Sequence, residues 1–177
     1  MQAYSLQFRR ERGRYVSYPH RESMAAMLGN TVNEDIDVLV ITDGAAILGI
    51  GDQGVGGMAI SVGKSIVYAL CAGISPERVL PIQLDVGTDN QALLDDPSYL
   101  GWRHNRVKGD DYLAFMDDFV KEARRLYPNA MLHWEDFDRD NAGVILKRYQ
   151  DQGCTFNDDM QGTGAVTLAA IFAALDK

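Results

Sequence analysis

Several features that would point to other protein classes are scarce in this sequence. Only two of its 177 residues are cysteines, Cys71 and Cys154, and neither lies in a C-x-x-C pair. No cluster of cysteine and histidine follows the spacing of a metal site. We therefore interpret both cysteines as reduced, buried thiols of a cytoplasmic protein.

Long hydrophobic segments and excess positive charge are also lacking. The first residues, MQAYSLQFRRERGRY, contain no apolar core of a secretory signal. No run of about 18 apolar residues predicts a transmembrane helix. The 17 Lys and Arg are outnumbered by 25 Asp and Glu, which gives a net charge of -8. This balance argues against nucleic acid or an anionic membrane as partner, and it suits binding of a metal cation.

The apolar pattern predicts an α/β domain. Runs at 37–43 and 79–85 are almost continuously apolar, which is typical of strands buried on both faces. Further strands are expected at 130–136 and 153–158, and helices at 21–29, 59–73, 109–128, 139–151 and 163–175. Because strands alternate with helices, we predict a parallel sheet in a layered α/β structure.

Acidic residues follow four of the expected strands. They are Asp43, Asp85, the pair Glu135 and Asp136, and the pair Asp158 and Asp159. Functional groups of parallel sheets gather beyond the carboxyl ends of the strands. The pair at 135–136 and one acid of the pair at 158–159 could supply three carboxylates to Mg²⁺ or Mn²⁺. The alternative is helix capping, by Asp158 or Asp159 for the last helix and by Asp136 or Asp138 for the helix before it.

Lys64 lies inside an otherwise apolar helix with several small residues, AISVGKSIVYAL. A lysine in a helix normally points to water. However, Val62 and Ile66 surround it, and Gly63 allows another backbone to approach closely. This context favours a partly desolvated lysine, whose pKa is lowered and which can act as a general base.

Two other motifs allow opposing interpretations. GIGDQG at 49–54 matches the dinucleotide motif G-x-G-x-x-G, but Gly56 and Gly57 delay the next helix and the following strand ends only at Asp85. We therefore predict a tight turn that binds no pyrophosphate. The basic segment GWRHNRVKG at 101–109 is either a solvated loop or a contact for an anionic ligand or a partner subunit.

Taken together, five segments resemble the malic enzyme family, including its malolactic enzyme branch. They are FRRERGRY (8–15), VITDGAAILGIGDQGVGGMAISVGKSIVYALCAGI (40–74), LPIQLDVGTDNQALLDDPSYLG (80–101), LHWEDFDRDNA (132–142) and CTFNDDMQGTGAVTLAAI (154–171). The resemblance implies a three-layer α/β/α fold with a mostly parallel sheet. It also implies that residues 1–177 form the substrate- and metal-binding domain. A tyrosine motif is expected upstream and a Rossmann NAD domain downstream, so this segment alone is expected to be inactive.

The resemblance also implies roles for individual residues. Glu135, Asp136 and Asp159 correspond to the ligands of Mn²⁺ or Mg²⁺, Lys64 to the general base, and Asp158 to the acid that hydrogen-bonds this lysine. The implied reaction is the oxidative decarboxylation of L-malate to pyruvate and CO₂ with reduction of NAD(P)⁺. Homodimers or homotetramers are expected.

Three further positions are assigned to ligands, and two of them depart from the family pattern. Ala46 stands at a substrate-binding position where many members carry arginine. Malolactic enzymes also lack this arginine. Arg139 stands where many members have an asparagine near the cofactor, and Asn141 is assigned to the same role. Malolactic chemistry, which yields lactate and CO₂, is therefore the alternative. A non-catalytic domain that binds a cation or a dicarboxylate is the third possibility.

Overall fold

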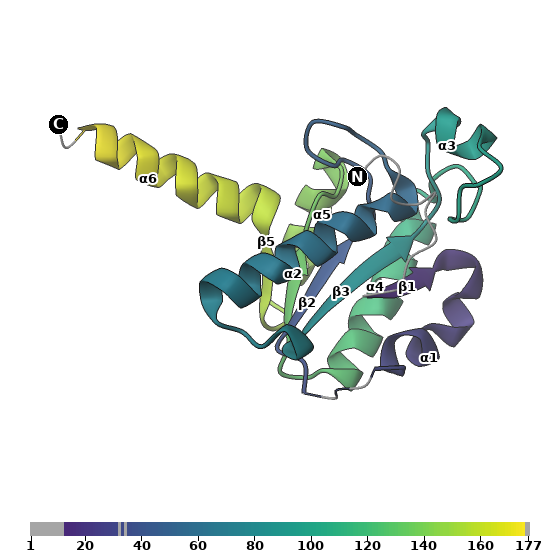
Figure 1. The fold of residues 1–177 in the computed structure, drawn as a ribbon, viewed down its shortest axis with the longest axis horizontal. Helices are drawn as coiled ribbons and strands as arrows, with labels where there is room; N and C mark the ends of the chain where they lie inside the picture. The colour runs from purple at the N-terminus through teal and green to yellow at the C-terminus, as the bar shows by residue number, and fades with distance from the viewer. Residues whose placement is uncertain (1–12, 32, 34, 176–177) are drawn as a thin grey trace.

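A five-stranded parallel sheet forms the centre of the computed structural model, which describes residues 13–31, 33 and 35–175 (Figure 1). Its spatial order is β1-β3-β2-β4-β5, and every neighbouring pair is parallel. The strands are β1 (Arg14–Ser17), β2 (Val38–Thr42), β3 (Val79–Asp85), β4 (Met131–Trp134) and β5 (Thr155–Asn157). The central strands β2 and β3 are buried at every residue, as expected from their apolar sequences.

Helices cover both faces of this sheet. The main helices are α1 (Met24–Gly29), α2 (Met58–Ala72), α3 (Gln91–Asp95), α4 (Gly109–Leu126), α5 (Arg139–Tyr149) and α6 (Thr163–Leu175). Short turns of other helix types are η2 (Tyr18–Ser23), η3 (Gly54–Gly57), η4 (Pro76–Arg78) and the π-helical η5 (Asp158–Gly162). Helices α1, α4 and α5 lie on one face and α2 lies on the other, so the predicted three-layer α/β/α fold is confirmed.

The larger part of the hydrophobic core lies between the sheet and α4. Leu39 and Ile41 of β2 point to this side and pack with Phe115 and Phe119 of the amphipathic α4. On the opposite side, Val38 and Val40 pack against the α2 layer, as period-2 alternation along a strand requires. Gly73 ends α2 with a φ of 69°, a left-handed conformation that glycine adopts without a steric penalty.

Some sequence-based expectations were wrong or incomplete. The edge strand β1 and the short helix α3 were not predicted, because four or five residues are too few to show a period. Cys71 and Cys154 are both free, but they are exposed rather than buried. In the motif at 8–15, residues 8–12 lie outside the described residues.

The expectation about membrane spans also needs correction. Among the described residues, the helical segment Gly54–Ala72 is long and apolar enough to cross a membrane. This criterion uses length and composition alone. In the structure the segment includes α2, which packs against β2 and β3 and carries Lys64.

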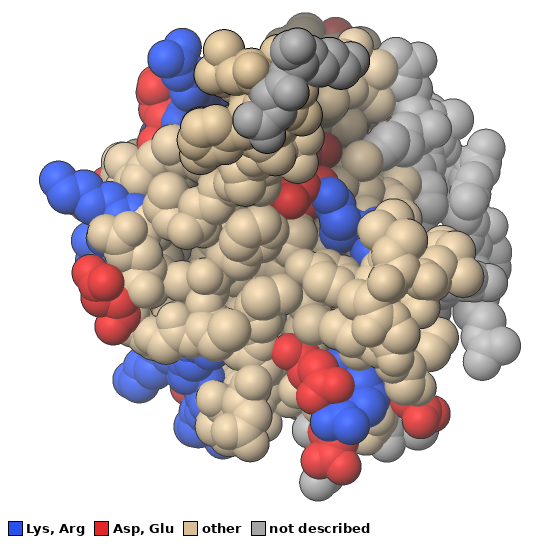
Figure 2. Space-filling view, turned by 90° about the vertical axis from the view of Figure 1, so that its left-hand side faces the viewer, with Lys and Arg blue, Asp and Glu red and all other residues tan. Residues whose placement is uncertain are grey.

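Helix α6 extends away from the sheet, and none of its residues is buried (Figure 1). Its exposed apolar side chains include Ile171 and Phe172, and α2 adds Ile66, Val67 and Leu70. Seen from the side on which α6 projects, the middle of the molecule shows few charged side chains (Figure 2).

Two leucines provide a matched test of the core. Leu39 is fully buried in β2, whereas Leu48 is 91% exposed in the loop after that strand. We expect Leu39→Ala to lower the free energy of unfolding by about 2–5 kcal/mol, because it leaves a cavity in the core. Leu48→Ala should leave it nearly unchanged in the same urea titration. Equal losses for both variants would contradict this description of the core.

Candidate active site

Acidic side chains meet a lysine at the carboxyl edge of the sheet. Glu135 and Asp136 directly follow β4, and Asp158 and Asp159 directly follow β5, which is its neighbour. Because parallel strands end at the same edge, the two pairs are brought together. Lys64 reaches this edge from α2.

The Lys64 ammonium is held by two carboxylates. Its Nζ lies 2.7 Å from Oδ2 of Asp158 and 3.0 Å from Oε1 of Glu135. The lysine side chain is 26% exposed, and it points to the acids rather than to bulk water. The expected hydrogen bond between Lys64 and Asp158 is therefore present, and the general-base role of Lys64 stays a prediction.

The lowered pKa that we expected for Lys64 is not found in this state. Burial alone would lower the pKa of Lys64, but the hydrogen bonds and charges of Asp158 and Glu135 outweigh it and raise this pKa. Lys64 is therefore a cation here. To act as a base it must lose this stabilisation when substrate and metal bind.

The other two acids form a second contact beside this ion pair. The backbone N–H of Asp136 donates to Oδ2 of Asp159 over 2.8 Å. Asp136 has a φ of 55°, a conformation that non-glycine residues rarely adopt and that is often found at functional sites. Burial and the neighbouring carboxylates Asp159 and Glu135 raise the pKa of Asp136 to about 7. Burial, together with Glu135 and Asp158, raises the pKa of Asp159 as well.

These residues fit a divalent metal ion. Carboxylate oxygens are the ligands that Mg²⁺ and Mn²⁺ prefer. Four carboxylates, those of Glu135, Asp136, Asp158 and Asp159, gather at this sheet edge around the single ammonium of Lys64. A cation bound by Glu135, Asp136 and Asp159 would remove this repulsion. The predicted ligand set remains a prediction.

Two residues that were not among the predicted site residues complete the site. His133 is 1% exposed, and its Nε2 lies 2.6 Å from Oε2 of Glu135. Its Nδ1 lies 2.6 Å from the hydroxyl of Tyr68, which is one helical turn beyond Lys64 on α2. In the described part of the chain, His133, Glu135 and Asp158 are the group whose possible metal-ligating atoms lie within 4.8 Å of one another, and this group shares only Glu135 with the predicted ligand set. The sequence could have indicated Tyr68 and His133 by spacing. Tyr68 lies four residues after Lys64, which places both on one side of a helix, and His133 lies two residues before Glu135, which places both on one face of a strand.

Helix capping explains only one of the acids. The Asp138 side chain accepts hydrogen bonds from the backbone N–H groups of Asp140 and Asn141 and so caps α5. At the start of η5 the capping residue is Asn157, which accepts from the backbone N–H of Met160. The capping alternative is therefore correct for Asp138, and no such cap is formed by Asp158 at η5.

A cavity of about 420 Å³ adjoins the acidic pairs. It is lined by Ala46, Phe137, Arg139, Ala142, Asp159 and Met160. The predicted substrate position Ala46, the predicted cofactor position Arg139 and the predicted metal ligand Asp159 therefore share one cavity. Asn141 lies apart from them: its amide donates to Asp138 over 2.6 Å, and it lines a neighbouring cavity of about 430 Å³.

The other acids at the sheet edge serve a structural network. Arg106 forms a bidentate pair with Asp52 at 2.7 and 2.9 Å and lies 3.6 Å from Asp43. Asp85 accepts hydrogen bonds from Ser17 and from the backbone N–H of Trp102. Arg106 of the basic segment at 101–109 is thus paired within the domain and holds the glycine-rich loop through Asp52.

The glycine-rich segment is a turn, as expected from its sequence context. Gly49, Gly51 and Gly54 have φ values of 80°, 74° and 48°, and α2 begins only at Met58. The strand before it, β2, ends at Thr42, so no strand runs directly into the motif. Its inability to bind pyrophosphate stays a prediction.

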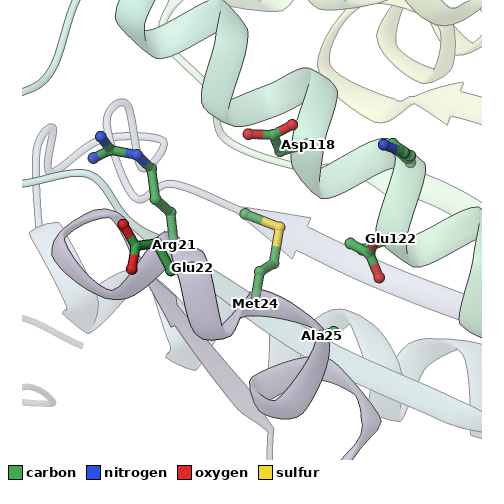
Figure 3. Close-up of a pocket in the computed structure, with 7 residues that line it drawn as sticks. Arg21, Glu22, Met24, Ala25, Asp118 and Glu122 are labelled. Carbon is green, nitrogen blue, oxygen red and sulfur yellow. The ribbon is translucent and has the colours of Figure 1, made fainter.

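A further cavity lies on the face of the sheet opposite to α2. It has a volume of about 180 Å³ and lies between α4 and the segment formed by η2 and α1 (Figure 3). Arg21, Glu22, Met24 and Asp118 are among its lining residues. It contains none of the residues assigned to the site.

A buried histidine, an ion-paired lysine and carboxylates with raised pKa values at one sheet edge are typical of enzymes that transfer protons. Comparison with known proteins agrees and is more specific. The family model for the malic enzyme N-terminal domain matches residues 1–150. The chain belongs to the malic enzyme family.

Two curated relatives are highly similar over nearly the whole chain. NAD-dependent malic enzyme 2 of Vibrio vulnificus (strain YJ016) is 53% identical over 173 residues, which are 98% of this chain and 31% of the relative. NAD-dependent malic enzyme of Salmonella arizonae is 52% identical over 167 residues, which are 94% of this chain and 30% of the relative. The chain thus spans less than a third of the length of these relatives.

The raised pKa of Asp136 predicts how stability depends on pH. The folded protein binds a proton at Asp136 up to about pH 7, whereas the ordinary pKa of an aspartate, which applies to the unfolded chain, is 3.8. The stabilising contribution of the protonated group is therefore lost as the pH rises from about 4 to about 7. Asp136→Asn keeps a neutral side chain, so we expect a melting temperature roughly 2–6 °C above wild type at about pH 7.5 and little difference at about pH 4.5.

Calorimetry of the metal-free chain measures this difference. Asp151→Asn is the matched control, because it removes an exposed acid after α5. A melting temperature for Asp136→Asn below wild type at neutral pH would contradict the electrostatic account of the site.

Proposed function

We propose that the protein to which this chain belongs catalyses the oxidative decarboxylation of L-malate to pyruvate and CO₂, with NAD⁺ and a divalent metal ion. The observation that carries the proposal is the position of Lys64 between Asp158 and Glu135, beside the pair Asp136 and Asp159. The names of the relatives, which are NAD-dependent malic enzymes, support the choice of reaction and cofactor.

The chain supplies the base for this reaction. Lys64, once neutral, takes the proton from the C2 hydroxyl of malate as the C2 hydride leaves. Asp158 orients the lysine and stabilises the ammonium that forms. When bound, Mn²⁺ or Mg²⁺ would polarise the C2 oxygen as a Lewis acid, and NAD⁺ would accept the hydride.

The metal would be held by Glu135, Asp136 and Asp159. Binding at these acids would draw negative charge away from Lys64, because Glu135, which contacts the lysine, would then also face the cation. The pKa of Lys64 would fall toward the range of a general base. In this way one group of acids serves both to hold a cation and to set the proton affinity of the lysine.

Malolactic chemistry is the second candidate, and Ala46 is the observation that favours it. This residue lines the cavity beside Asp159, where many family members carry an arginine. The two reactions differ in their products. An assay of the complete protein with malate, NAD⁺ and Mn²⁺ should give NADH and pyruvate. Lactate without NADH release would show the malolactic reaction instead.

A domain without catalytic activity is the third candidate. We expect the complete protein to lose turnover when the metal is chelated and to regain it when Mn²⁺ is added back. Calorimetry with Mn²⁺ and malate on the complete protein provides the parallel test. Binding of both ligands without any turnover would support a non-catalytic role.

The role of Lys64 can be tested by substitution. In the complete protein, Lys64→Ala should lower kcat roughly 10²–10⁴-fold, the usual contribution of a positioned acid or base. The affinity for Mn²⁺ should change little. Lys147→Ala serves as the control, since Lys147 is exposed on α5. Turnover of Lys64→Ala near the wild-type value would refute the assignment.

A further inference from the structure

We propose that His133 and Tyr68 are positioning residues of this site. They hold the Glu135 carboxylate in the orientation in which it contacts Lys64 and faces the metal ion. This inference rests on the proposed function, and it adds two residues that were not among the predicted site residues.

The fold places the four residues as two facing pairs. Alternation along β4 puts His133 and the following Glu135 on the same face of the sheet, two residues apart. Lys64 and Tyr68 are four residues apart on α2 and therefore lie on one side of that helix. As a result, Lys64 contacts Glu135 and Tyr68 contacts His133.

The hydrogen bonds join these pairs into one chain. The Tyr68 hydroxyl lies 2.6 Å from Nδ1 of His133, and Nε2 of His133 lies 2.6 Å from Oε2 of Glu135. The other oxygen of Glu135, Oε1, lies 3.0 Å from Lys64. A carboxylate can only accept, so Nε2–H of the imidazole donates to Glu135. In the neutral ring, Nδ1 then accepts from the Tyr68 hydroxyl.

This arrangement determines the direction of Glu135. The side chain of Glu135 is 8% exposed, and one of its oxygens is engaged by His133 and the other by Lys64. Without His133 the carboxylate could rotate toward the lysine. Removal of a group that orients a metal ligand in this way commonly lowers metal affinity or activity about 10–100-fold. We expect a loss of about this size when the hydrogen bond from His133 to Glu135 is removed.

Packing alone would not require these polar atoms. The His133 ring lies edge-on to Tyr68 and to Phe156, with ring centroids 5.5 and 5.4 Å apart. A phenylalanine at position 133 would keep similar ring contacts and lose both hydrogen bonds. The polar and packing contributions can therefore be separated by substitution.

The experiment compares four variants by Mn²⁺ affinity and by steady-state kinetics of the complete protein. His133→Phe should weaken Mn²⁺ binding, measured by electron paramagnetic resonance, and lower kcat, each about 10–100-fold. His133→Gln can still donate to Glu135 and should recover most of the loss. Tyr68→Phe should give a smaller loss. Phe156→Leu, which alters only packing on the same ring, should retain wild-type affinity and kcat.

A third measurement does not depend on metal or activity. In the metal-free chain, nitrogen NMR of His133 should show one tautomer with the proton on Nε2. Tyr68→Phe should give a mixture of tautomers, because Nδ1 loses its donor. A purely structural role would lower thermal stability without this change.

The outcomes distinguish the inference from the proposed function. If wild-type protein neither binds Mn²⁺ nor converts malate, the proposed function fails. If wild type does both and His133→Phe matches it in affinity and kcat, the inference alone is overturned. The inference is also overturned if Phe156→Leu reproduces the losses of His133→Phe.

Discussion

The ion pairs of Lys64 are the interaction on which the site depends. They connect α2, on one face of the sheet, to the ends of β4 and β5. Burying charges is costly, and a buried pair is stabilised only when its geometry is good and its remaining hydrogen bonds are satisfied. Here His133 satisfies the second oxygen of Glu135, and Tyr68 satisfies His133. The partly buried charge is thus accommodated by a continuous set of polar contacts.

The same site keeps an imbalance of charge that ligands can relieve. Asp136 and Asp159 have raised pKa values because burial and nearby carboxylates disfavour their ionised forms. A site with this property binds a cation more readily than a site with balanced charges. The site therefore stabilises the charged form of Lys64 and destabilises the charged forms of Asp136 and Asp159. Binding of a cation would reverse both effects.

Much of the fold followed from the sequence, because β2 and β3 are buried on both faces and consist of apolar residues. The strand order was not predictable, since alternation of strands and helices does not specify neighbours. That order decides that Asp43 and Asp85 meet Arg106 or Trp102, whereas Glu135 and Asp158 meet Lys64. The contact of Tyr68 with His133 depends on how α2 lies on the sheet. Individual roles came from the family resemblance.

The most direct test of the central claim is anomalous X-ray diffraction from crystals of the chain soaked in Mn²⁺. The account predicts a manganese peak bound by Glu135, Asp136 and Asp159, with Lys64 beside it. A peak bound instead by His133, Glu135 and Asp158, whose possible ligand atoms lie within 4.8 Å of one another, would contradict it. So would the lack of any peak at this sheet edge in the presence of excess Mn²⁺ and malate.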